Sequence, residues 1–152
     1  MVVKQDGSVW TTGWNEYGQL GDKSATDRTS YSQVVSSGVK AAAAGGRHSM
    51  ILKQDGSVWA TGYNEYGQLG DGSTTDSKVF VLVISGGAQV IAAGAFHSVV
   101  AMQDGSVWAV GSNKDGQFGD GSTKSKKSFV RVVQSDSGVK HDTSSSYAWI
   151  HL

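Results

Sequence analysis

One segment occurs three times in this chain, and it limits the possible folds more than any other feature. In the second copy it reads Q-D-G-S-V-W-A-T-G-Y-N-E-Y-G-Q-L-G-D-G, at residues 54–72. Asp6, Asp55 and Asp104 hold the same place in the three copies and lie 49 residues apart. A fixed period of this length is typical of stacked supersecondary units that bury their apolar faces against each other. We therefore expect three repeats, at about residues 1–49, 50–98 and 99–152, with the third degenerate at its C-terminal end.

Each repeat carries the signals of four short strands. An Asp-Gly pair stands between two apolar runs at Gly7, Gly56 and Gly105, and it predicts a hairpin with a type I′ turn. A glycine-spaced loop follows each hairpin. A third strand is expected at residues 31–35, 79–84 and 129–133, and a fourth, rich in small residues, at 41–45 and 90–94.

Four-stranded antiparallel units repeated around an axis are propeller blades. The pattern therefore predicts an all-β fold of three blades, either a partial propeller or one that an oligomer completes. A solenoid of stacked repeats is the competing geometry.

Composition removes several classes of function. Lys plus Arg and Asp plus Glu are both 13, so the net charge is zero and nucleic acid is not an expected partner. Because the chain has no cysteine, disulfides, thiolate nucleophiles and cysteine metal sites are excluded. The longest apolar run, residues 79–84, is too short to span a bilayer, so no membrane insertion is expected. The first residues do not form a signal peptide, and the compartment stays open.

The residues that could perform chemistry are explained better by the repeat. His48 and His97 are equivalent and each precedes a serine, which favours a neutral imidazole bonded to a neighbouring blade over a catalytic base. No Gly-x-Ser-x-Gly elbow is present. Residues 71–76 lack the pattern of a calcium loop, and the glycines of residues 62–72 lack the Gly-Lys-Ser/Thr of a phosphate cradle. We expect no enzymatic activity, no metal and no cofactor.

Repeated and varying positions suggest different roles. Trp10, Trp59 and Trp108 stand at one place in every hairpin, which favours packing between blades. In the following loop, the equivalent residues differ, and exposed aromatic residues at such positions are suited to recognition. The loop residues expected to contact a partner are Trp14, Glu16, Tyr17, Tyr63, Glu65, Tyr66, Asn113, Lys114 and Asp115.

Residues 59–72 and 92–98 resemble the regulator-of-chromosome-condensation repeat, and the resemblance extends over essentially the whole chain. It implies a β-propeller, usually of seven blades, whose last blade is closed by strands from both chain ends. The near-identical repeats are more similar to bacterial members, which include secreted inhibitors and surface proteins, and so favour an extracellular or cell-surface location. Two departures stand out. The family has a proline just before the strands at Tyr31, Phe80 and Phe129, and this chain has none. Three repeats also cannot close a seven-bladed ring.

These observations lead to a non-enzymatic propeller module that binds a protein through loop residues on a rigid face. The alternative is a structural repeat that assembles with copies of itself, as a closed ring, a surface layer or a filament. A third alternative, guanine-nucleotide exchange on a small GTPase, follows from the family name only. Because three open blades would leave apolar sheet faces uncovered, we also expect that the chain is not a stable monomer.

Overall fold

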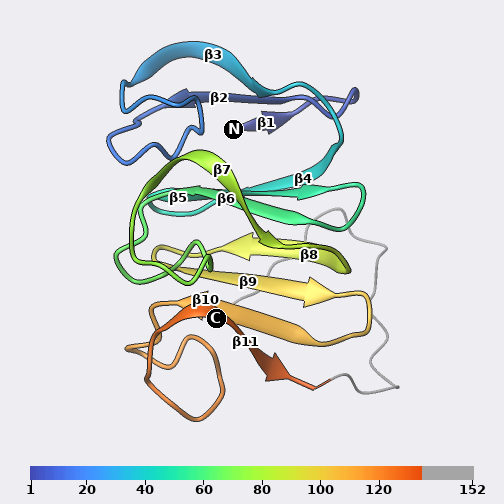
Figure 1. The fold of residues 1–152 in the computed structure, drawn as a ribbon, viewed down its shortest axis with the longest axis vertical. Helices are drawn as coiled ribbons and strands as arrows, with labels where there is room; N and C mark the ends of the chain where they lie inside the picture. Colours follow the sequence, from blue (N-terminus) through green and yellow to red (C-terminus); the bar gives the residue numbers. More distant parts are fainter. Residues whose placement is uncertain (135–152) are drawn as a thin grey trace.

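The computed structural model describes residues 1–134, which form three antiparallel β-sheets stacked one upon the next (Figure 1). The first sheet contains β1 (Val2–Val3), β2 (Val9–Gly13) and β3 (Arg28–Val35). The second contains β4 (Val39–Ala44), β5 (His48–Lys53), β6 (Val58–Gly62) and β7 (Ser77–Ile84). The third contains β8 (Ala88–Ala93), β9 (His97–Met102), β10 (Val107–Gly111) and β11 (Lys126–Val133). The predicted all-β class with four-stranded antiparallel sheets is confirmed.

The sheets are offset from the sequence repeats. The small-residue strand at the end of one repeat, such as β4, pairs with the hairpin of the next repeat, β5 and β6. The predicted degenerate end of the third repeat, residues 139–152, lies outside the described residues. Within residues 1–134 no helix is long and apolar enough to cross a membrane.

The hairpin turns differ from the predicted type I′ geometry. Gly56 has a φ of 80°, but Asp55 does not have a positive φ, whereas a type I′ turn requires one at both central residues. The Gly56 amide instead donates to the Lys53 carbonyl, and the Lys53 amide donates to the Ser57 carbonyl. This is a turn followed by a left-handed glycine that forms a bulge. Asp55 avoids the left-handed region because its carboxylate accepts bonds from the Ser57 amide and hydroxyl.

The core lies between the sheets, because alternate residues of a strand point to opposite faces. In β5, Met50 and Leu52 pack toward the third sheet with Val100, while Ile51 packs toward the first sheet with Val9. We call the interface of the first two sheets the first junction and that of the last two sheets the second junction. Every residue of β5 except Lys53 is buried, because the second sheet is covered on both faces.

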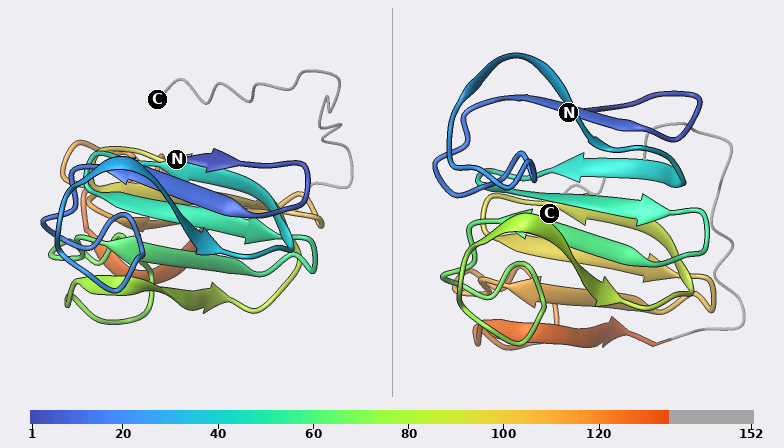
Figure 2. Two further views of the ribbon diagram at one scale, coloured as in Figure 1. Left: turned by 90° about the horizontal axis from the view of Figure 1, so that it is seen from above. Right: turned by 45° about the horizontal axis from the view of Figure 1, so that its top comes forward.

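All three long loops, which connect β2 to β3, β6 to β7 and β10 to β11, lie at the same edge of the stack (Figures 1 and 2). The turns between β4 and β5 and between β8 and β9 lie at this edge too, because the Tyr63 amide donates to the Arg47 carbonyl and the Ser112 amide donates to the Phe96 carbonyl. Loop side chains from three sheets are thereby brought to one face.

Candidate functional face

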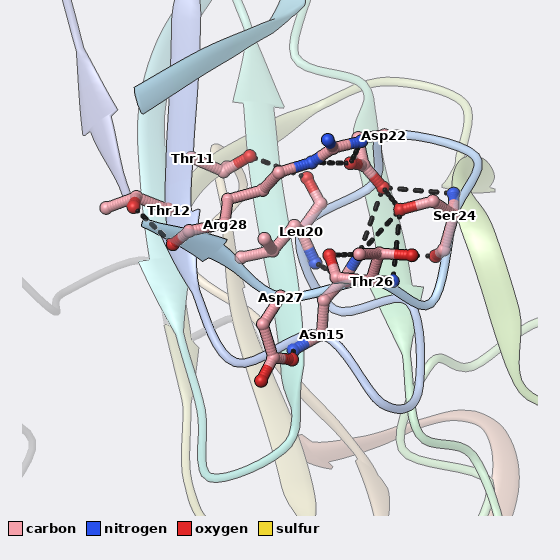
Figure 3. A network of polar contacts seen from close by, with 9 residues as sticks. All are labelled: Thr11, Thr12, Asn15, Leu20, Asp22, Ser24, Thr26, Asp27 and Arg28. Atoms are coloured by element: carbon pink, nitrogen blue, oxygen red, sulfur yellow. Dashed lines mark hydrogen bonds and ion pairs between the residues drawn. The ribbon is translucent and has the colours of Figure 1, made fainter. Parts of the chain in front are cut away.

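A buried asparagine organises each long loop. In the first loop the Asn15 amide group donates to Asp22, to Ser24 and to the carbonyl of Thr26, and its carbonyl oxygen accepts from the Leu20 amide (Figure 3). The same bonds recur around Asn64 and Asn113, and all three asparagines are completely buried. The loops are therefore rigid platforms, although they contain no regular secondary structure.

The first loop has an additional ion pair. The Arg28 guanidinium lies 2.6 Å from the Asp22 carboxylate, which Ser24 also contacts through its amide and hydroxyl. Partial burial acts to raise the pKa of Asp22, but the bonds from Ser24 and Arg28 outweigh it and lower that pKa to about 2. Because Ser77 and Lys126 stand at the place of Arg28, the other two loops lack this pair.

The first two long loops also pack on the outer strand of the next sheet, β7 and β11. A Cβ atom on Gly70 would lie 2.4 Å from the Phe129 ring, and one on Gly67 would lie 2.4 Å from the Lys127 backbone. Gly72 donates its amide to the Lys127 carbonyl across the second junction. The recurrent glycines of the loop therefore allow this close approach of neighbouring sheets.

A continuous row of aromatic and cationic side chains crosses this face. Tyr17 contacts both Trp14 and Tyr63, with ring centres 5.4 and 4.8 Å apart. Phe96 continues the row, at 6.2 Å from Tyr63 and 5.2 Å from Tyr66. We call this set the aromatic row; it comprises Trp14, Tyr17, Arg47, Tyr63, Tyr66, Phe96 and Lys114.

The cations of the aromatic row lie over its rings. The Arg47 guanidinium is 5.4 Å from the centre of the Tyr17 ring and 5.6 Å from that of Tyr63, within the range of cation–π attraction. It is also 5.7 Å from the Trp14 ring. The Lys114 ammonium is 4.9 Å from the Tyr66 ring. These contacts hold long side chains in place, so that less conformational entropy would be lost on binding.

The row ends at a hollow of about 280 Å³, which we call the Phe96 pocket. Its lining includes Tyr66, Phe96, His97, Ser112, Lys114 and Asp115. The pocket thus lies where the second and third sheets meet, at the same edge as the long loops.

Most loop residues that the sequence singled out lie at this face, but one does not. Trp14 is 44% exposed, and Glu16, Glu65, Lys114 and Asp115 are exposed as well. Tyr17, Tyr63 and Tyr66 are half-buried within the row. The expectation for Asn113 is wrong, because its side chain is fully buried and its polar atoms are used inside the loop.

Sequence reasoning missed Arg47 and Phe96. They stand 49 residues apart, each just before an equivalent histidine, and they differ between otherwise similar repeats. The comparison of varying positions that identified Trp14 and Tyr63 would also have identified this pair, had it been applied outside the loop.

The two equivalent histidines differ in position: His48 lies inside the second junction, whereas His97 is half-buried and lines the Phe96 pocket. His48 is 1% exposed, and its Nε2 lies 2.8 Å from the Ser98 hydroxyl of the third sheet. Because Ser98 donates its proton to the Gln68 carbonyl, it accepts from His48, so Nε2 carries the proton. Burial, with a smaller effect of His97, lowers the pKa of His48 to about 4. Burial also lowers the pKa of the half-buried His97.

The repeated tryptophans and hairpin glycines make recurrent contacts. The indole nitrogens of Trp10, Trp59 and Trp108 donate to Ser8, Ser57 and Ser106 at the same distance of 3.0 Å. Trp59 also packs against the cluster of Val9 and Ile51 in the first junction. The Gly7 and Gly56 carbonyls accept from the first strand of the next sheet, at Val39 and Ala88. The Gly105 amide donates to the Met102 carbonyl within the third hairpin.

The described residues include no group of three or more His, Asp or Glu side chains that could hold a metal ion. The aspartates that follow the first strand of each hairpin have a lowered pKa because they are engaged in turns. The Ser57 hydroxyl, followed by the Ser57 amide, lowers the pKa of Asp55, and Ser8 and Ser106 do the same for Asp6 and Asp104. What this face offers chemically is a rigid aromatic surface with charged side chains at its rim.

Solved propellers have the same fold. Prp20p from Saccharomyces cerevisiae, described with its binding properties to Gsp1p and histones, has a TM-score of 0.76 and 21% identity over 87% of this chain and 35% of its own. Human WBSCR16 has a TM-score of 0.72 and 20% identity, over 84% of this chain and 35% of its own. A structure of Kap60 bound to yeast RCC1 (Prp20) has a TM-score of 0.71 and 20% identity, over 87% of this chain and 34% of the matched chain.

This chain therefore spans about a third of the length of these propellers. No curated protein matches its sequence. The three sheets correspond to adjacent blades of such a propeller, as the repeat pattern predicted.

Family models agree with the fold. The model described as the regulator of chromosome condensation (RCC1) repeat matches residues 6–52 and 55–101. A second model with the same description matches residues 39–68 and 89–117. The matched segments together span residues 6–117, which include the first two long loops and part of the third, and the chain therefore belongs to the regulator of chromosome condensation repeat family.

Proposed function

We propose that this chain is a protein-binding propeller module, and that the aromatic row is its contact face. The observation that carries the proposal is the continuity of the row over three sheets, from Trp14 to Lys114. Tryptophan, tyrosine and arginine are the residues that most often dominate the energy of protein interfaces. Here the tryptophan and tyrosines stand on loops that buried asparagines hold rigid, and Arg47 stands on the neighbouring β4–β5 turn, which favours binding without large rearrangement.

Variation between the repeats supports this proposal. The buried loop asparagines and the tryptophans of the hairpins are the same in all three repeats, whereas the outward residues change. Trp14, Tyr63 and Ser112 are equivalent, and so are Glu16, Glu65 and Lys114. A face whose side chains vary over a constant frame is suited to recognition.

The similar propellers are consistent with a protein as partner. Prp20p is described with Gsp1p and histones, and the other yeast structure contains Kap60. Because this chain spans about a third of those proteins, their individual partners are not transferred to it. No feature of the aromatic row favours guanine-nucleotide exchange over other protein contacts.

Binding rather than catalysis is also supported by His48. Its Nε2 proton is committed to Ser98, and the side chain is closed to solvent. A general base must reach the proton that it abstracts from a substrate. We expect no turnover of generic ester or phosphate substrates; turnover that disappears in a variant carrying both His48→Ala and His97→Ala would contradict this.

Affinity capture from the native source tests the proposal. The immobilised parent is compared with a variant carrying Tyr17→Ser and Tyr63→Ser and with a Tyr31→Ser control, since Tyr31 is 54% exposed on β3 but lies outside the aromatic row. We expect a protein that the parent and the control retain and that the double variant loses. With that protein purified, the double variant should raise the dissociation constant at least tenfold, which corresponds to about 1.4 kcal/mol. Equal binding by all three proteins would contradict the proposal.

A second candidate function is self-assembly, which the outer face of the third sheet favours. On the second sheet, Leu69 and Val58 are covered by Ala88 and Val100 of the third. Their equivalents on the third sheet, Phe118 and Val107, line an apolar hollow of about 250 Å³.

The proposed occupant of that hollow is the first sheet of a second copy, giving a closed ring of six sheets or an open filament. Light scattering at low micromolar concentration should detect particles larger than 15.9 kDa. Val133 is 48% exposed beside the hollow, so Val133→Asp should reduce their size. A well-folded parent of 15.9 kDa with a cooperative melt would rule self-assembly out.

A further inference from the structure

The Phe96 pocket has the same backbone frame as a filled site at the first junction. The Ser112 amide donates to the Phe96 carbonyl at 2.8 Å, and the Tyr63 amide donates to the Arg47 carbonyl at 3.0 Å. Gly111 and Gly62, which precede Ser112 and Tyr63, have φ values of 103° and 110°. Ser112 and Tyr63 are thus equivalent both in the sequence and in the backbone.

At the first junction this place is filled by an aromatic ring. The Tyr63 ring lies 4.8 Å from Tyr17 of the preceding loop and 5.6 Å from the Arg47 guanidinium. Its hydroxyl donates to the Glu65 carboxylate, two residues further along the same loop. The ring therefore has a stacking surface on two sides and a polar group at its end.

At the second junction the neighbours of the ring are present, but the ring is not. Tyr66 takes the place of Tyr17, and Phe96 takes the place of Arg47; their ring centres are 5.2 Å apart. Ser112 has a hydroxymethyl group where Tyr63 has a phenol, and the hollow of about 280 Å³ lies beside it. Lys114 stands at the place of Glu65, so the polar end of the site carries an ammonium instead of a carboxylate.

We propose that the Phe96 pocket binds a tyrosine side chain of the partner protein, which takes the place that the Tyr63 ring has at the first junction. This inference rests on the proposed function, because it names the chemistry that one part of the aromatic row recognises. The ring packs on Phe96 and Tyr66, as offset and edge-on aromatic pairs do. The phenol oxygen accepts a hydrogen bond from the Lys114 ammonium, and this contact distinguishes tyrosine from phenylalanine.

Titration with N-acetyl-L-tyrosinamide, followed by amide chemical shifts in NMR spectra, tests the pocket directly. We expect saturable shifts at Phe96, Ser112 and Lys114, and none with N-acetyl-L-alaninamide. Ser112→Tyr supplies the missing ring from within the chain and should abolish the shifts, while Ser112→Ala leaves the pocket open and should retain them. Absence of saturable shifts in the parent, or equal shifts in the Ser112→Tyr protein, overturns the inference.

Lys114→Ala gives a second test that does not depend on the folding of the Ser112→Tyr protein. Lys114 is exposed, so its truncation leaves the pocket frame unchanged. The parent should bind the tyrosine probe at least threefold more tightly than N-acetyl-L-phenylalaninamide, and Lys114→Ala should remove this preference. A parent without the preference contradicts the role of Lys114 and with it the choice of tyrosine.

Failure of this inference can be told apart from failure of the proposed function. Suppose that the captured partner is lost by the Tyr17→Ser and Tyr63→Ser variant, but binds the Ser112→Tyr protein as tightly as the parent. The proposed function is then supported, and the Phe96 pocket has no part in it. If the probe binds saturably but no captured protein depends on the aromatic row, the pocket binds tyrosine and the proposed function is contradicted.

Discussion

The two junctions have the same backbone contacts but different side chains. At the first, the Val39 amide donates to the Gly7 carbonyl, and at the second the Ala88 amide donates to the Gly56 carbonyl. The side chains that cross them differ. Thr61 donates to the Gly18 carbonyl across the first junction, while Val110 holds the place of Thr61 in the third sheet. The second junction is instead crossed by the bond between His48 and Ser98.

This difference shows that the same main-chain bonds recur at both junctions, while some of the side chains that cross them vary. The variation is largest at the loop edge, where Arg47 is replaced by Phe96, and Tyr63 by Ser112. A propeller can thus change the side chains at its loop edge from blade to blade while it keeps the same backbone contacts.

The largest expected loss of stability comes from replacing the loop asparagines. Two hydrogen bonds of Asn64 in the second loop are shorter than the equivalent bonds of Asn113 in the third. Asn64→Ala leaves the buried Leu69 amide without an acceptor and removes the donors to Asp71 and Thr75, at 3.2 and 3.1 Å. We expect the free energy of unfolding to fall by about 3 kcal/mol. The equivalent bonds of Asn113, to Asp120 and the Lys124 carbonyl, are 3.5 Å long. Asn113→Ala should therefore cost less, and equal losses in urea denaturation would contradict this ranking.

The second junction should be sensitive to pH through His48. Its pKa is lowered from 6.5 to about 4 in the fold, so the unfolded chain binds more protons between these values, and stability falls as the pH falls through them. The loss from pH 7 to pH 4 should approach about 3 kcal/mol. The midpoint of urea denaturation should depend less on pH in the His48→Gln variant than in the parent or in a His97→Gln control. A parent whose midpoint is constant between pH 7 and pH 4.5 would count against the assignment.

One hairpin glycine, Gly56, and one loop glycine, Gly121, allow a test of the close main-chain contact between sheets. Gly56 and Gly121 both have a positive φ, of 80° and 77°. A Cβ at Gly56 would lie 2.8 Å from the Gly87 nitrogen, whereas nothing lies within 4 Å of one at Gly121. Gly56→Val should therefore destabilise by about 2 kcal/mol and Gly121→Val by about 1 kcal/mol. Thermal melts that show the same loss for both variants would mean that backbone conformation alone sets the cost.

The smallest expected effect concerns the threonine that crosses the first junction. Thr61→Val gives the second sheet the residue that the third sheet has, and it removes the bonds to the Gly18 and Ser77 carbonyls. We expect a loss of about 1 kcal/mol, since the two carbonyls lose the one buried hydroxyl proton that they share. The reverse change, Val110→Thr, should cost nothing or stabilise slightly if the second junction has the same backbone. Chemical denaturation of both variants checks this, and a strongly destabilised Val110→Thr protein would show that the two frames differ.

Several features were predictable because they depend on neighbours in the sequence. The Asp-Gly pairs indicated the hairpins, since a left-handed glycine between two apolar runs favours a reversal of the chain. The matched glycines indicated a loop after each hairpin. The aromatic residues of the loops were identified because the equivalent positions differ between repeats.

Other features could not be read from local sequence. The type of hairpin turn depended on the Ser57 bonds to Asp55, which keep that residue out of the left-handed region. Asn113 was expected among the loop residues that contact a partner, yet the loop closes around its side chain.

The sequence by itself determined the repeat, the all-β class and the family. The 49-residue period and its turn residues can be read from the order of the residues, whatever the conformation of the chain. Only the tertiary structure decided which residues form the aromatic row. Arg47 meets Tyr17 and Tyr63, and His48 meets Ser98, across separations of many residues. These contacts exist because stacked sheets bring equivalent edges together, and the packing that sets their partners is a property of the whole stack.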